Sequence, residues 1–61
     1  MIQLNVKNTV LEVREWLQNM VVRGCLSERE MVRIVKRFSE EKQKAQEGQR
    51  FIIIEGVVIG V

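Results

Sequence analysis

The chain has 61 residues, 46% of them hydrophobic and 30% charged, which is the composition of one small globular domain rather than of a disordered segment. It has no histidine and a single cysteine, Cys25, which excludes an intramolecular disulfide, a Cys/His zinc site and imidazole catalysis. The net charge of +2 excludes a strongly basic nucleic-acid binder. We therefore expect no enzyme and no cofactor, and we expect so small a chain to gain stability by oligomerisation.

The N-terminal segment predicts a strand over residues 2–7, because apolar and polar residues alternate there. The apolar side chains on one face are Ile2, Leu4 and Val6, and the polar side chains on the other are Gln3, Asn5 and Lys7. Two amides and a cation in a row suit a reader of the DNA major groove, since Asn and Gln pair with adenine edges and Lys reaches guanine or phosphate. A half-buried edge strand with a solvated polar face has the same pattern.

Two helices follow the strand. Apolar residues at three- and four-residue steps predict an amphipathic helix over residues 9–22, and Gly24 suits the turn after its C-terminus. The Ser27-x-x-Glu30 sequence has the form of a capping box and predicts a second helix over residues 27–47, which Gly48 ends. The apolar stripe of this second helix includes Phe38, and its basic residues lie on the opposite side.

The C-terminal segment FIIIEGVVIGV is rich in β-branched residues and lacks a helical period. It predicts strands at residues 50–54 and 57–60, either as a hairpin around Glu55-Gly56 or as one bulged strand. At 11 residues it is too short for a membrane-spanning helix. The expected fold class is α+β, and we expect no membrane association, no signal peptide and a cytoplasmic location.

The order of strand, helix, glycine turn and capped helix resembles the ribbon-helix-helix family of DNA-binding proteins, over about the first 40 residues. The resemblance rests on the alternation of Gln3, Asn5 and Lys7, and on Gly24 and Glu30 in register with them. It implies an intertwined homodimer, or a higher oligomer, that acts as a repressor of a phage or mobile element. Its paired N-terminal strands would enter the major groove of double-stranded DNA.

The resemblance also implies that Ser27 and Arg29 hold a DNA phosphate at the start of the second helix. The residues expected at the interface between subunits are Ile2, Leu4, Val6, Trp16, Phe38, Phe51 and Ile53. Trp16 lies on the apolar stripe of the first helix, which indicates a place in the core or in this interface.

A second interpretation stays open, because the apolar C-terminal strands are not part of the minimal ribbon-helix-helix fold. The N-terminal strand can pair with the C-terminal strands of its own chain, which gives a β-α-α-β-β domain with two helices on one face of the sheet. We then expect a protein-binding module, such as a phage-type inhibitor or adaptor of a host protein. It would dock through its basic second helix or a free sheet edge.

Overall fold

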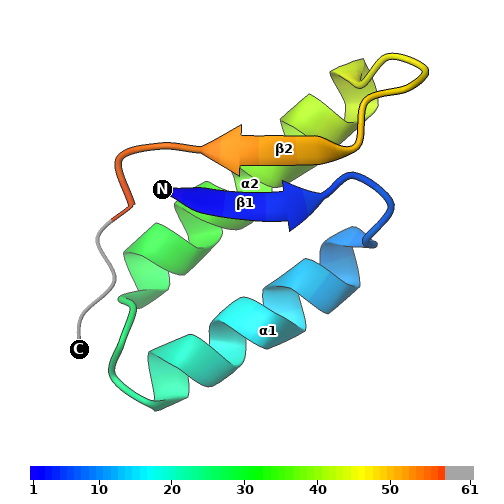
Figure 1. The fold of residues 1–61 in the computed structure, drawn as a ribbon. Coiled ribbons are helices and arrows are strands. Elements are labelled where there is room, and N and C mark those ends of the chain that lie inside the picture. Colours follow the sequence, from blue (N-terminus) through cyan, green and yellow to red (C-terminus); the bar gives the residue numbers. More distant parts are fainter. Residues whose placement is uncertain (58–61) are drawn as a thin grey trace.

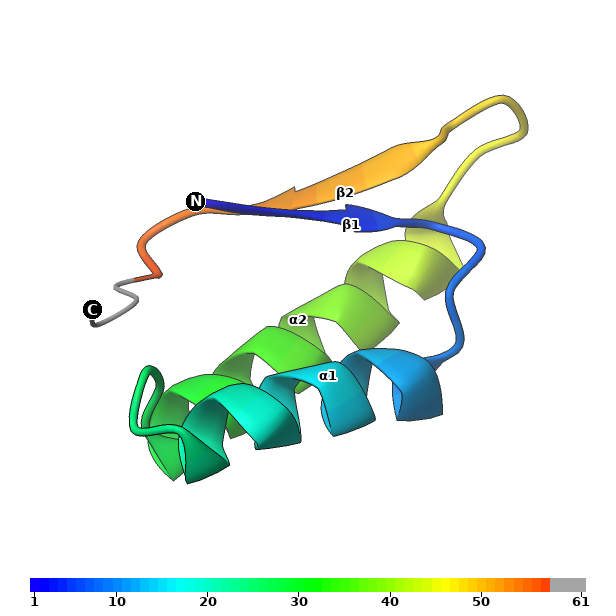
Figure 2. The ribbon, with the colours of Figure 1, turned by 60° about the horizontal axis from the view of Figure 1, so that its bottom comes forward.

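The computed structural model describes residues 1–57. Its elements are, in chain order, β1 (Ile2–Asn5), α1 (Val10–Val22), α2 (Glu28–Lys44) and β2 (Phe51–Ile54). The two strands form an antiparallel sheet (Figure 1), and both helices lie on one face of it (Figure 2). This confirms the α+β class with a strand, two helices and a C-terminal strand. The sequence also predicts a strand at residues 57–60. Val57 is buried but is not part of a strand, and residues 58–60 are not among the described residues.

The sheet joins the two ends of the same chain. Ile2 pairs with Ile54 and Leu4 with Ile52, and the Val6 N–H continues the ladder by donating to the Arg50 carbonyl at 2.9 Å. The pairing buries the apolar face of β1 against the helices, because side chains alternate across a strand.

β1 ends at Asn5, two residues earlier than the sequence predicts, because a turn begins there. The Asn5 side-chain oxygen accepts a hydrogen bond from the Lys7 N–H at 2.8 Å. The Asn5 carbonyl accepts another from the Asn8 N–H at 3.0 Å. Asparagine favours this turn, since its short side chain can satisfy the backbone two residues on. Lys7 therefore belongs to the turn and not to the strand.

Both ends of α1 follow from local sequence. The Thr9 hydroxyl caps the N-terminus, so the first helical residue is the one after the predicted start. Gly24 has a φ of 80° and ends the helix as predicted. Around it the Gly24 N–H donates to Val21 at 3.0 Å and the Cys25 N–H to Met20 at 2.9 Å, which is a Schellman motif.

α2 begins one residue after the predicted start, at Glu28, and ends three residues before the predicted end, at Lys44. The Ser27 hydroxyl caps it by accepting a hydrogen bond from the Glu30 N–H at 3.1 Å. At the other end Ala45 is extended, with ψ 134°. A turn then closes from the Gln49 N–H to the Gln46 carbonyl at 3.1 Å. This turn reverses the chain so that β2 can return antiparallel to β1.

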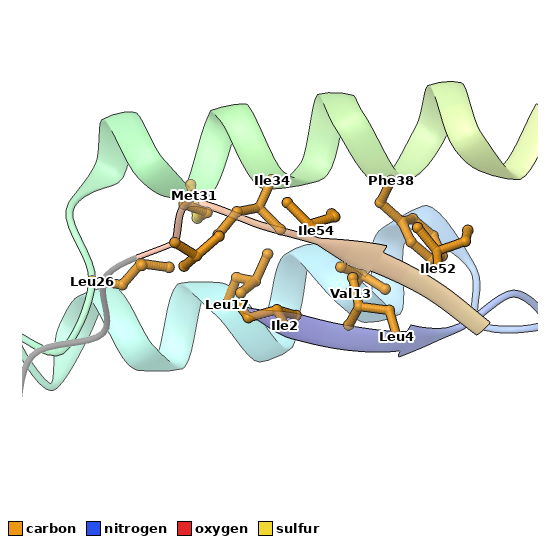
Figure 3. Close-up of a cluster of buried hydrophobic side chains, with 11 residues drawn as sticks. Ile2, Leu4, Val13, Leu17, Leu26, Met31, Ile34, Phe38, Ile52 and Ile54 are labelled. Carbon is orange, nitrogen blue, oxygen red and sulfur yellow. The ribbon is translucent and has the colours of Figure 1, made fainter.

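The core lies between the sheet and the helix pair (Figure 3). Its buried side chains are Ile2, Leu4, Val13, Leu17, Leu26, Met31, Ile34, Phe38, Ile52, Ile54 and Val57. Phe38, Leu17 and Ile34 have no exposed surface. Burial of each large aliphatic or aromatic side chain stabilises the fold by about 1.5–3 kcal/mol. None of the described helices is long and apolar enough to cross a membrane.

Lys42, near the end of α2, forms hydrogen bonds to the turn after β1. The Lys42 Nζ donates to the Val6 carbonyl at 2.6 Å and to the Asn8 carbonyl at 2.8 Å. It also lies 5.8 Å from the centre of the Phe38 ring. These contacts join segments more than 30 residues apart in sequence. Lys42 therefore fixes the position of the strand on the helix pair.

Candidate binding face and groove

Within residues 1–57, no segment covers the face of the sheet turned away from the helices (Figure 2). Strand register places Gln3 opposite Ile53 and Asn5 opposite Phe51 on this face. The exposed fraction is 49% for Phe51 and 54% for Ile53. We call these four residues the open face. Phe51 and Ile53 alternate on one strand beside two amides, and an apolar patch rimmed by polar groups is the usual form of a protein-binding surface.

The structure separates the nucleic-acid-binding residues predicted from the sequence into two places. Gln3 and Asn5 lie side by side on the open face, whereas Lys7 lies in the turn beyond it. Ser27 and Arg29 are exposed at the start of α2, in the helix layer on the other side of the sheet. The polar row expected along one strand is therefore limited to two amides.

The residues predicted for an interface between subunits also divide into two groups. Ile2, Leu4 and Phe38 are buried in the core of the single chain, with Val6 packed at its margin. Phe51 and Ile53 lie on the open face instead. Trp16 is 47% exposed, because Val13 and Leu17 of the same helix take the positions that face the core.

A groove of about 620 Å³ lies between α2 and β2. We call it the β2–α2 groove. Its lining residues are Arg33, Lys36, Arg37, Glu40, Ile53, Ile54 and Glu55. Three bases thus face two acids, and Ile53 also belongs to the open face. The sequence predicts that α2 has a basic side. It does not reveal that this side lies along the β2 edge of the sheet.

Arg33 holds one end of this groove in place. Its guanidinium donates to both carboxylate oxygens of Glu30, at 2.9 and 3.1 Å, and to the carbonyl of Gly56 at 2.9 Å. The hydrogen bonds from Arg33 lower the pKa of the Glu30 carboxyl group, and their reciprocal effect raises the pKa of Arg33. The pair therefore stays charged and attaches the segment after β2 to α2.

The other basic residues of the groove are less engaged. Arg37 pairs with Glu41 at 3.5 Å, and its side chain is largely exposed. Among residues 1–57, Lys36 has no ion pair within 4.0 Å. An ion pair between exposed side chains contributes little to stability. Lys36 and Arg37 therefore contribute little to stability, and they share the groove with the carboxylates of Glu40 and Glu55.

A second, smaller groove of about 290 Å³ lies beside β1. It is lined by Gln3, Leu4, Asn5, Asn8, Glu12, Val13 and Trp16. Its single charged residue is the acidic Glu12. The two edges of the sheet therefore differ in their charged groups, with three bases and two acids beside β2 and a single acid beside β1.

The described part of the chain holds no group of three or more Cys, Asp or Glu side chains placed to bind a metal ion.

Comparisons with known proteins do not identify a family or a function. No protein-family model, no curated protein and no solved structure matches the chain. The resemblance to ribbon-helix-helix proteins therefore stays a prediction.

Proposed function

We propose that the protein is a small non-catalytic protein-binding module, an inhibitor or adaptor of a host protein. The observation that carries this proposal is the open face, where Phe51 and Ile53 are about half exposed on a sheet whose other face is buried. The two helices already support the sheet from one face (Figure 2), so the apolar side chains of the other face are free to meet a partner. The pairing of β1 with β2 in one chain favours this function over an intertwined ribbon.

The test compares captured proteins between variants of the whole chain. The open-face variant is Phe51→Ser with Ile53→Ser, and the matched control is Leu11→Ser with Val22→Ser, since these α1 side chains are also exposed apolar residues. Circular dichroism checks that each variant is folded. A partner captured from extracts of the source cells, then purified and titrated, should lose at least about tenfold in affinity for the open-face variant alone. Equal affinity for both variants would refute a role for the open face.

Sequence-specific DNA binding by a homodimer is a second candidate function. Its support is the exposure of Gln3 and Asn5 side by side, and of Ser27 and Arg29 at a helix start. The dimer would form its ribbon from the β1 strands of two copies, with the amides toward the base edges.

Duplex binding distinguishes this function from the first. Counterion release predicts an affinity that falls steeply with salt, and Gln3→Ala should weaken sequence preference without unfolding the chain, since the Gln3 side chain is exposed. Light scattering should then show a dimer. A monomer that binds no duplex DNA at low salt would exclude this candidate.

A further inference from the structure

The smaller groove, beside β1, brings together an exposed tryptophan and a carboxylate. We call it the β1–α1 groove, because its lining comes from β1, from the turn after β1 and from α1. Glu12 and Trp16 are four residues apart on α1, so their side chains are neighbours on one side of the helix. The Trp16 side chain is about half exposed. An aromatic ring beside a carboxylate is a setting that attracts a cation.

The Glu12 carboxylate is not engaged by the rest of the described chain. Glu12 stands three residues after the cap Thr9, and in a complete capping box its carboxylate would accept a hydrogen bond from the Thr9 N–H. Among residues 1–57 this box is incomplete. The Glu12 N–H donates to the Thr9 hydroxyl at 3.1 Å, while the Glu12 carboxylate has no hydrogen bond and no ion pair within 4.0 Å. Its charge is therefore open to a ligand in the groove.

The charge along the β1–α1 groove has one sign. Among the described residues, Glu12 is the single charged group in the lining, and the amides of Gln3, Asn5 and Asn8 supply further hydrogen-bond acceptors. The ammonium group of Lys42 bonds to the Asn8 carbonyl but is not part of the lining. A cationic group therefore meets an acid and no base there, in contrast to the β2–α2 groove, where bases and acids are mixed.

We infer that the β1–α1 groove binds an arginine side chain of a partner protein. The guanidinium group lies on the indole ring of Trp16 and donates hydrogen bonds to the Glu12 carboxylate. Arginine suits the groove better than lysine, because a planar guanidinium can stack on an aromatic ring and still donate within its own plane. This inference rests on the proposed protein-binding function and names one group of the partner. Gln3 and Asn5 belong to both the groove and the open face, so one partner can contact both.

The probe is the capped tripeptide glycine-arginine-glycine, compared with the same peptide carrying citrulline, which keeps the shape of arginine without its charge. Trp16 is the single tryptophan of the chain, so its indole N–H signal in an NMR titration of the whole protein reports on the groove. We expect the arginine peptide to shift this signal saturably, and its affinity to fall as salt rises. The citrulline peptide should bind about threefold more weakly or less tightly still.

Two variants test the two groups of the groove. Glu12→Gln should weaken binding of the arginine peptide by about threefold or more, because the carboxylate is lost while the Thr9 cap of the helix remains. The matched control Glu15→Gln removes an exposed acid of the same helix outside the lining and should keep its affinity. Trp16→Leu should weaken binding by a similar factor, read from the backbone amide signal of Glu12, because leucine has no aromatic ring. Circular dichroism checks that each variant is folded.

Several results would overturn the inference. They are a Trp16 signal that does not move, a citrulline or lysine peptide that binds as tightly as the arginine peptide, and equal loss in Glu15→Gln and Glu12→Gln. If the arginine peptide fails to bind while the Phe51 and Ile53 serine variant still loses the captured partner, the inference is wrong and the proposed function stands. If the arginine peptide binds while that serine variant keeps the partner, the groove stands and the role of the open face is wrong.

Discussion

Replacement of Lys42 by methionine tests how α2 is attached to the start of the chain. Methionine keeps most of the aliphatic stem that lies near Phe38 but removes the ammonium group. The carbonyls of Val6 and Asn8 then lose a charged donor at 2.6 and 2.8 Å. We expect the Lys42→Met variant to fold but with a lower free energy of unfolding.

The magnitude follows from the two hydrogen bonds. A bond to a charged group contributes about 1.5–3 kcal/mol. Both hydrogen bonds are only partly buried, so in the variant water can donate to the two carbonyls in place of the lysine. We therefore expect the free energy of unfolding to fall by about 1–2 kcal/mol. A chain of 61 residues has an unfolding free energy of about 3–9 kcal/mol. The expected fall in melting temperature is then about 4–16 °C.

Urea unfolding followed by circular dichroism measures the loss. Lys44→Met is the matched control, because Lys44 also lies in the last turn of α2 but is exposed, and makes no hydrogen bond to the Val6 or Asn8 carbonyls. Its free energy of unfolding should change by less than about 0.5 kcal/mol. Equal unfolding free energies for the two variants would show that Lys42 does not hold the strand in solution.

Three further predictions concern single residues. Phe38→Ala removes the largest fully buried side chain and should lower the free energy of unfolding in urea by about 3–5 kcal/mol, a large part of the total of about 3–9 kcal/mol; a loss below about 1 kcal/mol would contradict its place in the core. Gly24→Ala should cost about 1–2 kcal/mol in urea unfolding, because the φ of 80° opposes a Cβ although no atom lies within 4 Å of it; no loss would contradict the left-handed conformation. NMR titration should give a pKa for Glu30 below that of an ordinary glutamate, and Arg33→Gln should return it to the ordinary value. Because the folded pKa is lowered, the stabilising effect of the pair is present above the ordinary glutamate pKa and is lost as the pH falls through the folded value.

The sequence predicts the elements well because their signals are local. Gly24 and Ser27 mark the end of α1 and the start of α2, and both act through the backbone of their own turn. The end of β1 was predicted two residues late, since alternation continues through Lys7 while the Asn5 side chain closes a turn. The end of α2 was predicted late as well, because the residues up to Glu47 are strong helix formers.

The pairing of the strands and the place of each site residue depend on the tertiary fold. β1 and β2 are at opposite ends of the chain, and their alternation is compatible with pairing within or between chains. Lys42 is not identified as a structural residue from the sequence. Its position four residues after Phe38 places it on the apolar stripe of the helix, and a lysine on such a stripe indicates a buried polar contact. The β2–α2 groove combines residues about 20 apart in sequence, so no local pattern reveals it.

NMR on mixed samples shows whether β1 pairs with β2 inside one chain, on which the fold and the open face both depend. Equal amounts of isotope-labelled and unlabelled protein are combined, and a filtered experiment separates contacts within a chain from contacts between chains. Gln3 with Ile53 and Asn5 with Phe51 are close antiparallel pairs, so their Hα protons should show strong contacts. We expect these contacts within the labelled chain alone. Contacts between the β1 strands of two chains, without contacts from β1 to β2, would show that the strands pair between chains instead.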